Sequence, residues 1–139
     1  MTITATRKLE FDAAHRVKKH ESKCKNLHGH RYVVEVTAEA PELDALGRVV
    51  DFGELKEKLG SWIDEHWDHQ TILFAEDKAL GDAIAEQTGQ PIFYLPENPT
   101  AENMAKYLLE VVCPQLFSAP LKISKITLRE TPNCWVEVF

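Results

Sequence analysis

Residues 3–15, ITATRKLEFDAAH, and residues 28–40, HGHRYVVEVTAEA, decide the fold of this chain. In both segments apolar and polar side chains alternate with a period of two, which is typical of β-strands with one buried face. The apolar set occupies the odd positions of the first segment, with Arg7 as its one interruption, and the even positions of the second. We therefore predict two long, half-buried strands that pair antiparallel.

Capping residues and apolar stripes of helical period predict three helices further along the chain. They are expected over residues 51–67, 77–88 and 100–114. Asp51 and Thr100 are typical N-cap residues, Gly89 suits a helix C-terminus, and Pro114 should limit the last helix. The expected buried stripes are Phe52, Leu55, Leu59, Trp62, Ile63 and His66 in the first helix, and Met104, Tyr107, Leu108, Val111 and Val112 in the last.

The end of the chain predicts a second pair of strands. Residues 121–130 and 134–139 are joined by a turn at Pro132 and Asn133. Counting the two main helices, the order is ββααββ, which predicts a single α+β domain over residues 1–139. Its antiparallel four-stranded sheet would carry helices on one face. The edges of such a sheet are open, and pairing them with neighbouring subunits would protect them.

Composition excludes several classes of protein. With 139 residues, 44% of them hydrophobic, the chain is large enough to bury one core. A net charge of −6 argues against binding to nucleic acid or to an anionic membrane. No stretch is long and apolar enough to span a membrane, and the start does not resemble a signal peptide, so we expect a cytoplasmic protein. The three cysteines, an odd number, suit reduced thiols.

The segment from Arg16 to Lys25 is basic in an otherwise acidic chain. It holds five lysines or arginines against one acid, Glu21, a balance of +4. This segment is either a solvated loop or a source of positive charge at the mouth of a site for an anionic ligand. Its position between the two histidine-bearing strands favours the second interpretation.

Three histidines can converge at the end of the predicted hairpin. His28 and His30 are two residues apart on one strand and share a face, and His15 ends the neighbouring strand. Three histidine ligands leave the fourth tetrahedral position of zinc open, as in catalytic sites. An accidental His-Gly-His pair is the alternative. Cys24 lies between two lysines that favour its thiolate, so it could act as a base or nucleophile, or be a fourth zinc ligand.

Other candidate residues give weaker signals. In Asp68-His69 the carboxylate could set the tautomer and basicity of the imidazole. Glu130 is either a solvated strand end or a carboxylate that accepts two donors from a guanidine-like edge of a ligand. Cys113 and Cys134 are expected to be ordinary buried thiols.

Together these residues resemble one family nearly from end to end, the 6-pyruvoyl- and 6-carboxy-tetrahydropterin synthases. The likeness is carried by Phe11-Asp12-Ala13-Ala14-His15, the segment from Cys24 to His30, Val50-Asp51-Phe52 with Leu55-Lys56, Asp68-His69, Asn98-Pro99-Thr100-Ala101-Glu102-Asn103, and Glu130-Thr131. The site residues that the resemblance implies are zinc ligands at His15, His28 and His30, a catalytic thiol at Cys24, a proton-transfer pair at Asp68 and His69, and a pterin anchor at Glu130. The further expected substrate contacts are Thr100, Glu102, Lys18 and Lys23.

The resemblance also implies an assembly and a reaction. In the tunnelling fold of this family, subunits join their sheets into a barrel and build active sites at their contacts, here as a homohexamer built from trimers. Three residues separate Cys24 from His28, a spacing that looks like the 6-carboxy branch of queuosine (7-deazaguanine) biosynthesis. The implied reaction is zinc-dependent conversion of 7,8-dihydroneopterin triphosphate to 6-carboxy-5,6,7,8-tetrahydropterin, acetaldehyde and triphosphate. The alternatives are a 6-pyruvoyl-tetrahydropterin synthase, a non-catalytic zinc or pterin-binding protein, and a metal-dependent hydrolase.

The chain departs from the family pattern around the Asp-His pair. Trp67 stands where the family usually has Leu, and Ile72 and Leu73 stand where it has Leu-Asn. The stretch over residues 74–97 is also longer than in compact members. These differences predict an altered pocket lining.

Overall fold

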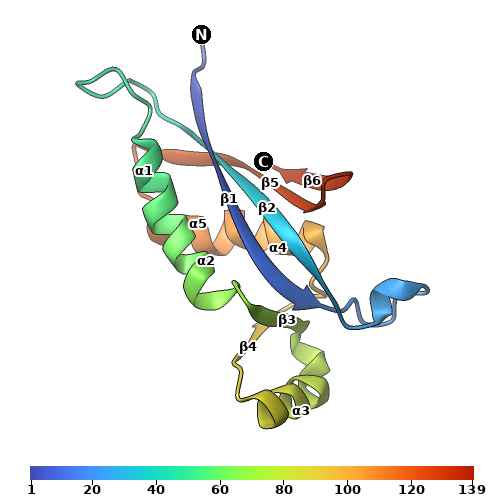
Figure 1. The fold of residues 1–139 in the computed structure, drawn as a ribbon. Helices are drawn as coiled ribbons and strands as arrows, with labels where there is room; N and C mark the ends of the chain where they lie inside the picture. Colours follow the sequence, from blue (N-terminus) through green and yellow to red (C-terminus); the bar gives the residue numbers. More distant parts are fainter.

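The computed structural model describes all residues from Met1 to Phe139 and has one curled, mixed sheet (Figure 1). The sheet has six strands in the spatial order β4-β3-β1-β2-β5-β6. They are β1 (Thr4–His15), β2 (His28–Glu39), β3 (Gln70–Phe74), β4 (Ile92–Leu95), β5 (Lys122–Thr131) and β6 (Cys134–Val138). The α+β class is confirmed.

The long hairpin of β1 and β2 is confirmed over its whole length. The two strands pair antiparallel from Thr4 with Glu39 to His15 with His28. Their alternation places one set of side chains under the helices, where the rings of Phe11 and Tyr32 stack at 5.0 Å. The predicted strands at the end of the chain are also present, with β5 antiparallel to β2 and β6 antiparallel to β5.

The prediction of four antiparallel strands is wrong, because β3 and β4 extend the sheet at the β1 side. β3 pairs with residues 13–15 of β1, and β4 pairs with β3, both in parallel. Both are short, and β4 lies in a segment between Pro91 and Pro96 that resembles a loop in sequence. The stretch over residues 74–97 is therefore an ordered crossover, made mainly of α3 (Lys78–Thr88) and β4.

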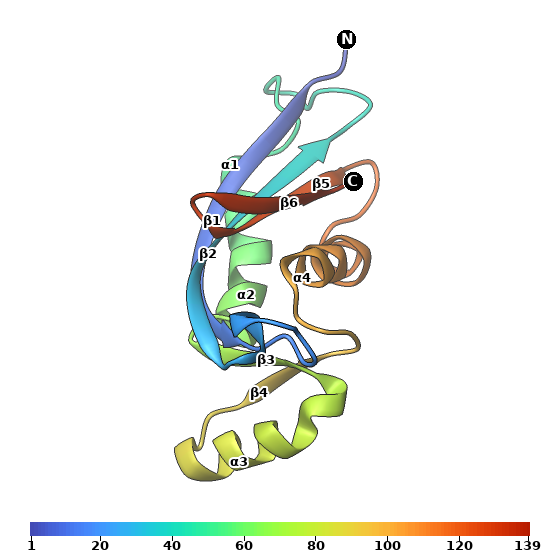
Figure 2. The ribbon, with the colours of Figure 1, turned by 90° about the vertical axis from the view of Figure 1, so that its right-hand side faces the viewer.

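The predicted helices are present, and two of them cover one face of the sheet (Figure 2). The first runs through α1 (Phe52–Leu55), a π-helical turn (Lys56–Gly60) and α2 (Ser61–His66). The last runs through α4 (Ala101–Tyr107), a π-helical turn (Leu108–Val112) and α5 (Cys113–Leu116). The side chains of Asp51 and Thr100 cap these helices, and Gly89 ends α3 with a φ of 71°. Pro114 lies inside α5, so it does not end the last helix where expected.

Several predictions of burial need correction. Phe52 is 53% exposed and Val111 39% exposed, so both fall outside the stripes that pack on the sheet. Cys134 is exposed, whereas Cys113 is buried as predicted, and burial raises the pKa of the Cys113 thiol to about 12. The three departures from the family pattern, Trp67, Ile72 and Leu73, are fully buried, so they fill the core and do not line an open pocket. None of the helices is both long and apolar enough to cross a membrane.

Candidate active site

The three predicted histidine ligands converge at the end of the hairpin where β1 ends and β2 begins. His15 and His28 are directly opposite in the register, and His30 is opposite Ala13, so all three side chains lie on the helix-covered face. One ring nitrogen of each lies within 4.8 Å of those of the others. Gly29, between the two histidines, lies close to the backbone of β1, since a Cβ at this position would be 3.3 Å from the Ala13 carbonyl oxygen.

Backbone carbonyls orient two of these rings toward a common point. His15 Nδ1 is 2.7 Å from the Pro99 carbonyl oxygen, and His28 Nδ1 is 2.7 Å from that of Asn26. Because a carbonyl only accepts hydrogen bonds, each Nδ1 carries the proton. In the neutral rings the two Nε2 lone pairs then face each other at 3.2 Å. Such a pair repels unless a cation lies between them, so the geometry fits a metal ion.

Protonation favours the same conclusion. Burial lowers the pKa of His15 to about 4, although the hydrogen bond to Pro99 opposes this, and the neighbouring His28 and His30 lower it further. Burial also lowers the pKa of His30, against the raising effect of Glu130. Both imidazoles are therefore neutral at pH 7, which is the form that binds metals. The buried Nε2 of His30 has no hydrogen-bond partner in the protein, as expected for an atom that would bind a metal ion.

Glu130, the expected pterin anchor, lies beside the histidines. Its Oε1 is 3.4 Å from His30 Nε2, without the geometry of a hydrogen bond, and its side chain is about one quarter exposed at 26%. Tyr32 is completely buried under the site, and its hydroxyl has no partner. Burial, and then the Glu130 carboxylate, raise the pKa of Tyr32. Glu130 is thus a partly accessible carboxylate at the rim of the cluster.

Asp68 and His69 form the expected pair, but at a distance from the triad. Asp68 Oδ2 is 3.0 Å from His69 Nδ1, and Asp68 Oδ1 accepts the Asp12 amide N–H at 3.0 Å. Burial alone would raise the pKa of Asp68, but the bonds from Asp12 and His69 outweigh it and the net shift is downward. His69 is mostly exposed and has a left-handed backbone with a φ of 59°. The pair clusters with the Asp12 carboxylate, which lies on the opposite face of β1 from His15.

The basic segment is anchored at its start. Arg16 makes a bidentate ion pair with the buried carboxylate of Asp77, and this pair lowers the pKa of Asp77. Lys18 donates from its Nζ to the Glu76 carbonyl at 2.9 Å. Cys24 is half-buried in a single helical turn, Lys23–Lys25, and its sulfur does not belong to the cluster of ring nitrogens. Arg16 and Lys18, two of the basic residues predicted to face an anionic ligand, thus interact with other residues of the chain.

The segment after β4 provides contacts that sequence reasoning did not assign. The Asn98 side chain bonds the Lys18 backbone, and the Pro99 carbonyl orients His15. Thr100 accepts the Asn103 amide N–H as the N-cap of α4, and Glu102 is exposed in the first turn. The roles of Thr100 and Glu102 as substrate contacts stay predictions. An Asn-Pro pair just before a helix cap was the available signal, since such pairs often fix loops.

The fold and the site define a class of protein, an α+β domain with a three-histidine cluster that could hold a metal ion and a separate Asp-His pair. The family model for 6-pyruvoyl tetrahydropterin synthase matches residues 4–139, so the chain belongs to this family. A 6-carboxy-5,6,7,8-tetrahydropterin synthase of Rickettsia bellii is 50% identical over 137 residues, covering 98% of this chain and 99% of that protein. The enzyme of the same name from Aquifex aeolicus is 34% identical over 91% of each chain.

Solved structures show the same architecture. The 6-pyruvoyl tetrahydropterin synthase of Caenorhabditis elegans superposes with a TM-score of 0.70 at 27% identity, covering 99% of this chain and 95% of that one. An uncharacterized protein of Wolinella succinogenes superposes with a TM-score of 0.83 at 23% identity, covering 100% of this chain and 98% of that one. The second likeness concerns the fold alone.

Proposed function

We propose that this protein is a zinc-dependent 6-carboxy-5,6,7,8-tetrahydropterin synthase, a carbon–carbon lyase. It would convert 7,8-dihydroneopterin triphosphate to 6-carboxy-5,6,7,8-tetrahydropterin, acetaldehyde and triphosphate, as a step toward queuosine. The observation that carries the proposal is the set of three imidazoles whose ring nitrogens lie within 4.8 Å of one another, in a chain with a relative of that activity at 50% identity over 98% of its length. The three-residue spacing between Cys24 and His28 agrees with this branch of the family.

Zinc fits the donor set. Two nitrogens bound to one tetrahedral zinc at roughly 2.0 to 2.1 Å would lie about 3.3 Å apart, and the Nε2 atoms of His15 and His28 are 3.2 Å apart. Three protein ligands leave one coordination position for substrate. Since the sulfur of Cys24 lies outside the ligand cluster, a closed four-ligand structural site is disfavoured.

The side chains would divide the chemistry as follows. When bound, zinc would act as a Lewis acid on the hydroxyl groups of the substrate side chain. Glu130 would accept two N–H groups of the pterin ring and fix its orientation. Cys24 and His69 would take up and return protons along the side chain, with Asp68 holding the Nδ1 proton of His69 so that Nε2 is the acceptor. Lysines of the basic segment would bind the triphosphate until it leaves.

The distribution of these groups supports a homo-oligomer. In one subunit His69 clusters with Asp12, on the opposite face of β1 from His15. A complete site would therefore combine the histidines of one subunit with the Asp68-His69 pair of another. This arrangement agrees with the barrel of sheets expected for the tunnelling fold, built as trimers that pair into a hexamer.

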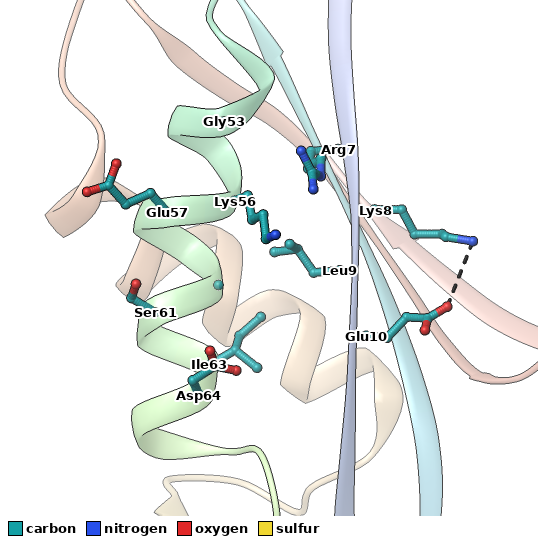
Figure 3. Close-up of a pocket in the computed structure, with 11 residues that line it drawn as sticks. Arg7, Lys8, Leu9, Glu10, Gly53, Lys56, Glu57, Ser61, Ile63 and Asp64 are labelled. Atoms are coloured by element: carbon teal, nitrogen blue, oxygen red, sulfur yellow. Dashed lines mark ion pairs between the residues drawn. The ribbon is translucent and has the colours of Figure 1, made fainter.

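The open edges of the sheet offer the contact surfaces. β3 covers only residues 13–15 of β1, so this side of β1 has no partner strand from Thr4 to Asp12. The two terminal strands of the sheet, β4 and β6, each have a further free edge. Beside the β1 edge lies a groove of about 600 Å³ between the strand and the first helix (Figure 3). Arg7, Leu9 and Lys56 point into it. Pairing β1 with β6 of a neighbour would satisfy both edges and cover this groove.

Product analysis tests the proposed reaction. We would incubate the zinc-loaded protein with 7,8-dihydroneopterin triphosphate and identify the pterin and any acetaldehyde by mass spectrometry, with a His28→Ala, His30→Ala double variant as control. The expected products are 6-carboxy-5,6,7,8-tetrahydropterin and acetaldehyde. A 6-pyruvoyl product would assign the other branch of the family, and a dihydroneopterin that has lost phosphate but keeps its hydroxylated side chain would indicate a hydrolase. Metal binding without any product would indicate a binding protein.

A further inference from the structure

The side-chain amide of Asn98 is bonded at both ends to the backbone of a single residue in the basic segment. Asn98 Oδ1 accepts the Lys18 amide N–H at 2.9 Å, and Asn98 Nδ2 donates to the Lys18 carbonyl at 3.1 Å. The two residues are 80 positions apart in sequence. Asn98 therefore replaces a partner strand at this point and holds the segment where it leaves β1.

Asn98 is itself fixed from the start of α4. Its carbonyl oxygen accepts the Thr100 amide N–H at 2.8 Å and the Asn103 Nδ2–H at 3.0 Å. The next carbonyl, that of Pro99, accepts the Nδ1–H of His15. One short stretch, Asn98 and Pro99, thus holds both a histidine of the metal cluster and the basic segment relative to the same helix.

A backbone hydrogen bond next to Lys18 links the start of the basic segment to the backbone of Cys24. The neighbouring Val17 N–H donates to the Cys24 carbonyl at 2.8 Å, which closes the segment into a loop. Immediately after the Asn98 contact, Lys19 turns the chain with a left-handed φ of 68°. The bonds at Val17 and Lys18 therefore set the direction in which the loop carries Lys23 and Cys24 away from β1.

We infer that Asn98 is a positioning residue, which acts through the Lys18 backbone to hold the loop of Cys24 and the lysines in place beside the histidines. For its catalytic consequence this inference rests on the function proposed above. For its structural consequence it rests only on the bonds just described.

The test compares Asn98→Ala with Thr88→Val. Thr88 also makes two side-chain hydrogen bonds to the backbone, to Ile84 and Gln90, but at the end of α3 and outside the loop. For each zinc-loaded variant we would measure amide hydrogen exchange of the peptide covering residues 16–25, zinc content, kcat and KM. In Asn98→Ala we expect faster exchange in that peptide, unchanged zinc, and a kcat/KM about 10-fold lower, the usual scale for a lost supporting contact. Thr88→Val should change none of these.

Three results would overturn the inference. They are unchanged exchange over residues 16–25, zinc lost in proportion to activity, and an equal loss of kcat/KM in Thr88→Val. If Asn98→Ala does not fold, Asn98→Asp carries the same expectation, because it keeps the acceptor for the Lys18 N–H but places a carboxylate oxygen against the Lys18 carbonyl. If the wild-type protein forms no product, the proposed function fails, whereas exchange and zinc content still decide the role of Asn98.

Discussion

The Asp68-His69 pair permits a prediction about the tautomer of one imidazole. In Asp68→Asn the amide oxygen should keep the bond to the Asp12 N–H, which is 3.0 Å in the wild type, because that donor needs an acceptor. The NH₂ group then faces His69 Nδ1, which must give up its proton and become an acceptor. The ring proton moves to Nε2, the atom that should accept a proton from substrate.

The expected loss is that of one general base. Such a loss lowers kcat by about 10² to 10⁴, or roughly 3 to 5 kcal/mol in activation free energy. Zinc content should not change, because neither Asp68 nor His69 belongs to the cluster of His15, His28 and His30 that would hold the metal. Stability should change by less than about 1 kcal/mol, because the bond to Asp12 is retained. KM should stay near the wild-type value, since the role proposed for the pair is proton transfer and not substrate binding.

Steady-state kinetics of product formation measure this effect, with thermal unfolding and zinc analysis on the same samples. Asp82→Asn is the matched control, because it removes one carboxylate that pairs with Lys78 on the exposed side of α3. The control should retain wild-type kinetics. If kcat of Asp68→Asn stays within about twofold of the wild type, the pair has no part in proton transfer and the reasoning is wrong.

Further predictions concern the metal, the thiol and the buried ion pair. The His28→Ala, His30→Ala double variant should lose zinc on dialysis, since changes at ligand sites lower affinity by about 100-fold or more; stoichiometric zinc by elemental analysis would contradict the assignment. Cys24→Ala should keep its zinc and its fold but lose turnover, whereas zinc loss would make Cys24 a ligand. Asp77→Asn should lower the free energy of unfolding by about 2 kcal/mol, less than for a fully buried pair because Arg16 is one-third exposed. Arg16 holds the pKa of Asp77 below its ordinary value of 3.8, so this stabilisation is present above that pH and is lost as the pH falls further. Urea unfolding at several pH values should show that the difference in free energy of unfolding between the wild type and Asp77→Asn becomes smaller in acid. A difference that does not change with pH would refute the ion pair as its cause.

The parts of the fold with strong periodicity could be predicted from the sequence. The β1–β2 hairpin was predictable because a period of two over a dozen residues fixes which side chains share a face, and the convergence of the histidines follows from it. The caps Asp51 and Thr100 were predictable because their side chains bond local backbone amides.

The remaining features depend on contacts that are distant in sequence. β3 and β4 have only five and four residues, too few to show a period, and their pairing becomes favourable only once β1 is in place. The ion pair of Arg16 with Asp77 joins segments 61 residues apart, and no local pattern marks either partner. The separation of Asp68-His69 from the histidines could not be derived either, because it depends on where the chain returns to β1.

The close spacing of the three histidines along the chain has a consequence for biosynthesis. All three histidines lie between residues 15 and 30, in one hairpin, so bringing them together closes only a short loop and costs little chain entropy. Contacts of such short range can form before the rest of the chain has been synthesised. If the protein binds zinc as proposed, the nascent hairpin should therefore be able to bind the metal early. Pro99, whose carbonyl orients His15, is synthesised only later. The affinity of the three histidines for the metal ion should therefore rise in a second stage, when α4 packs on the sheet.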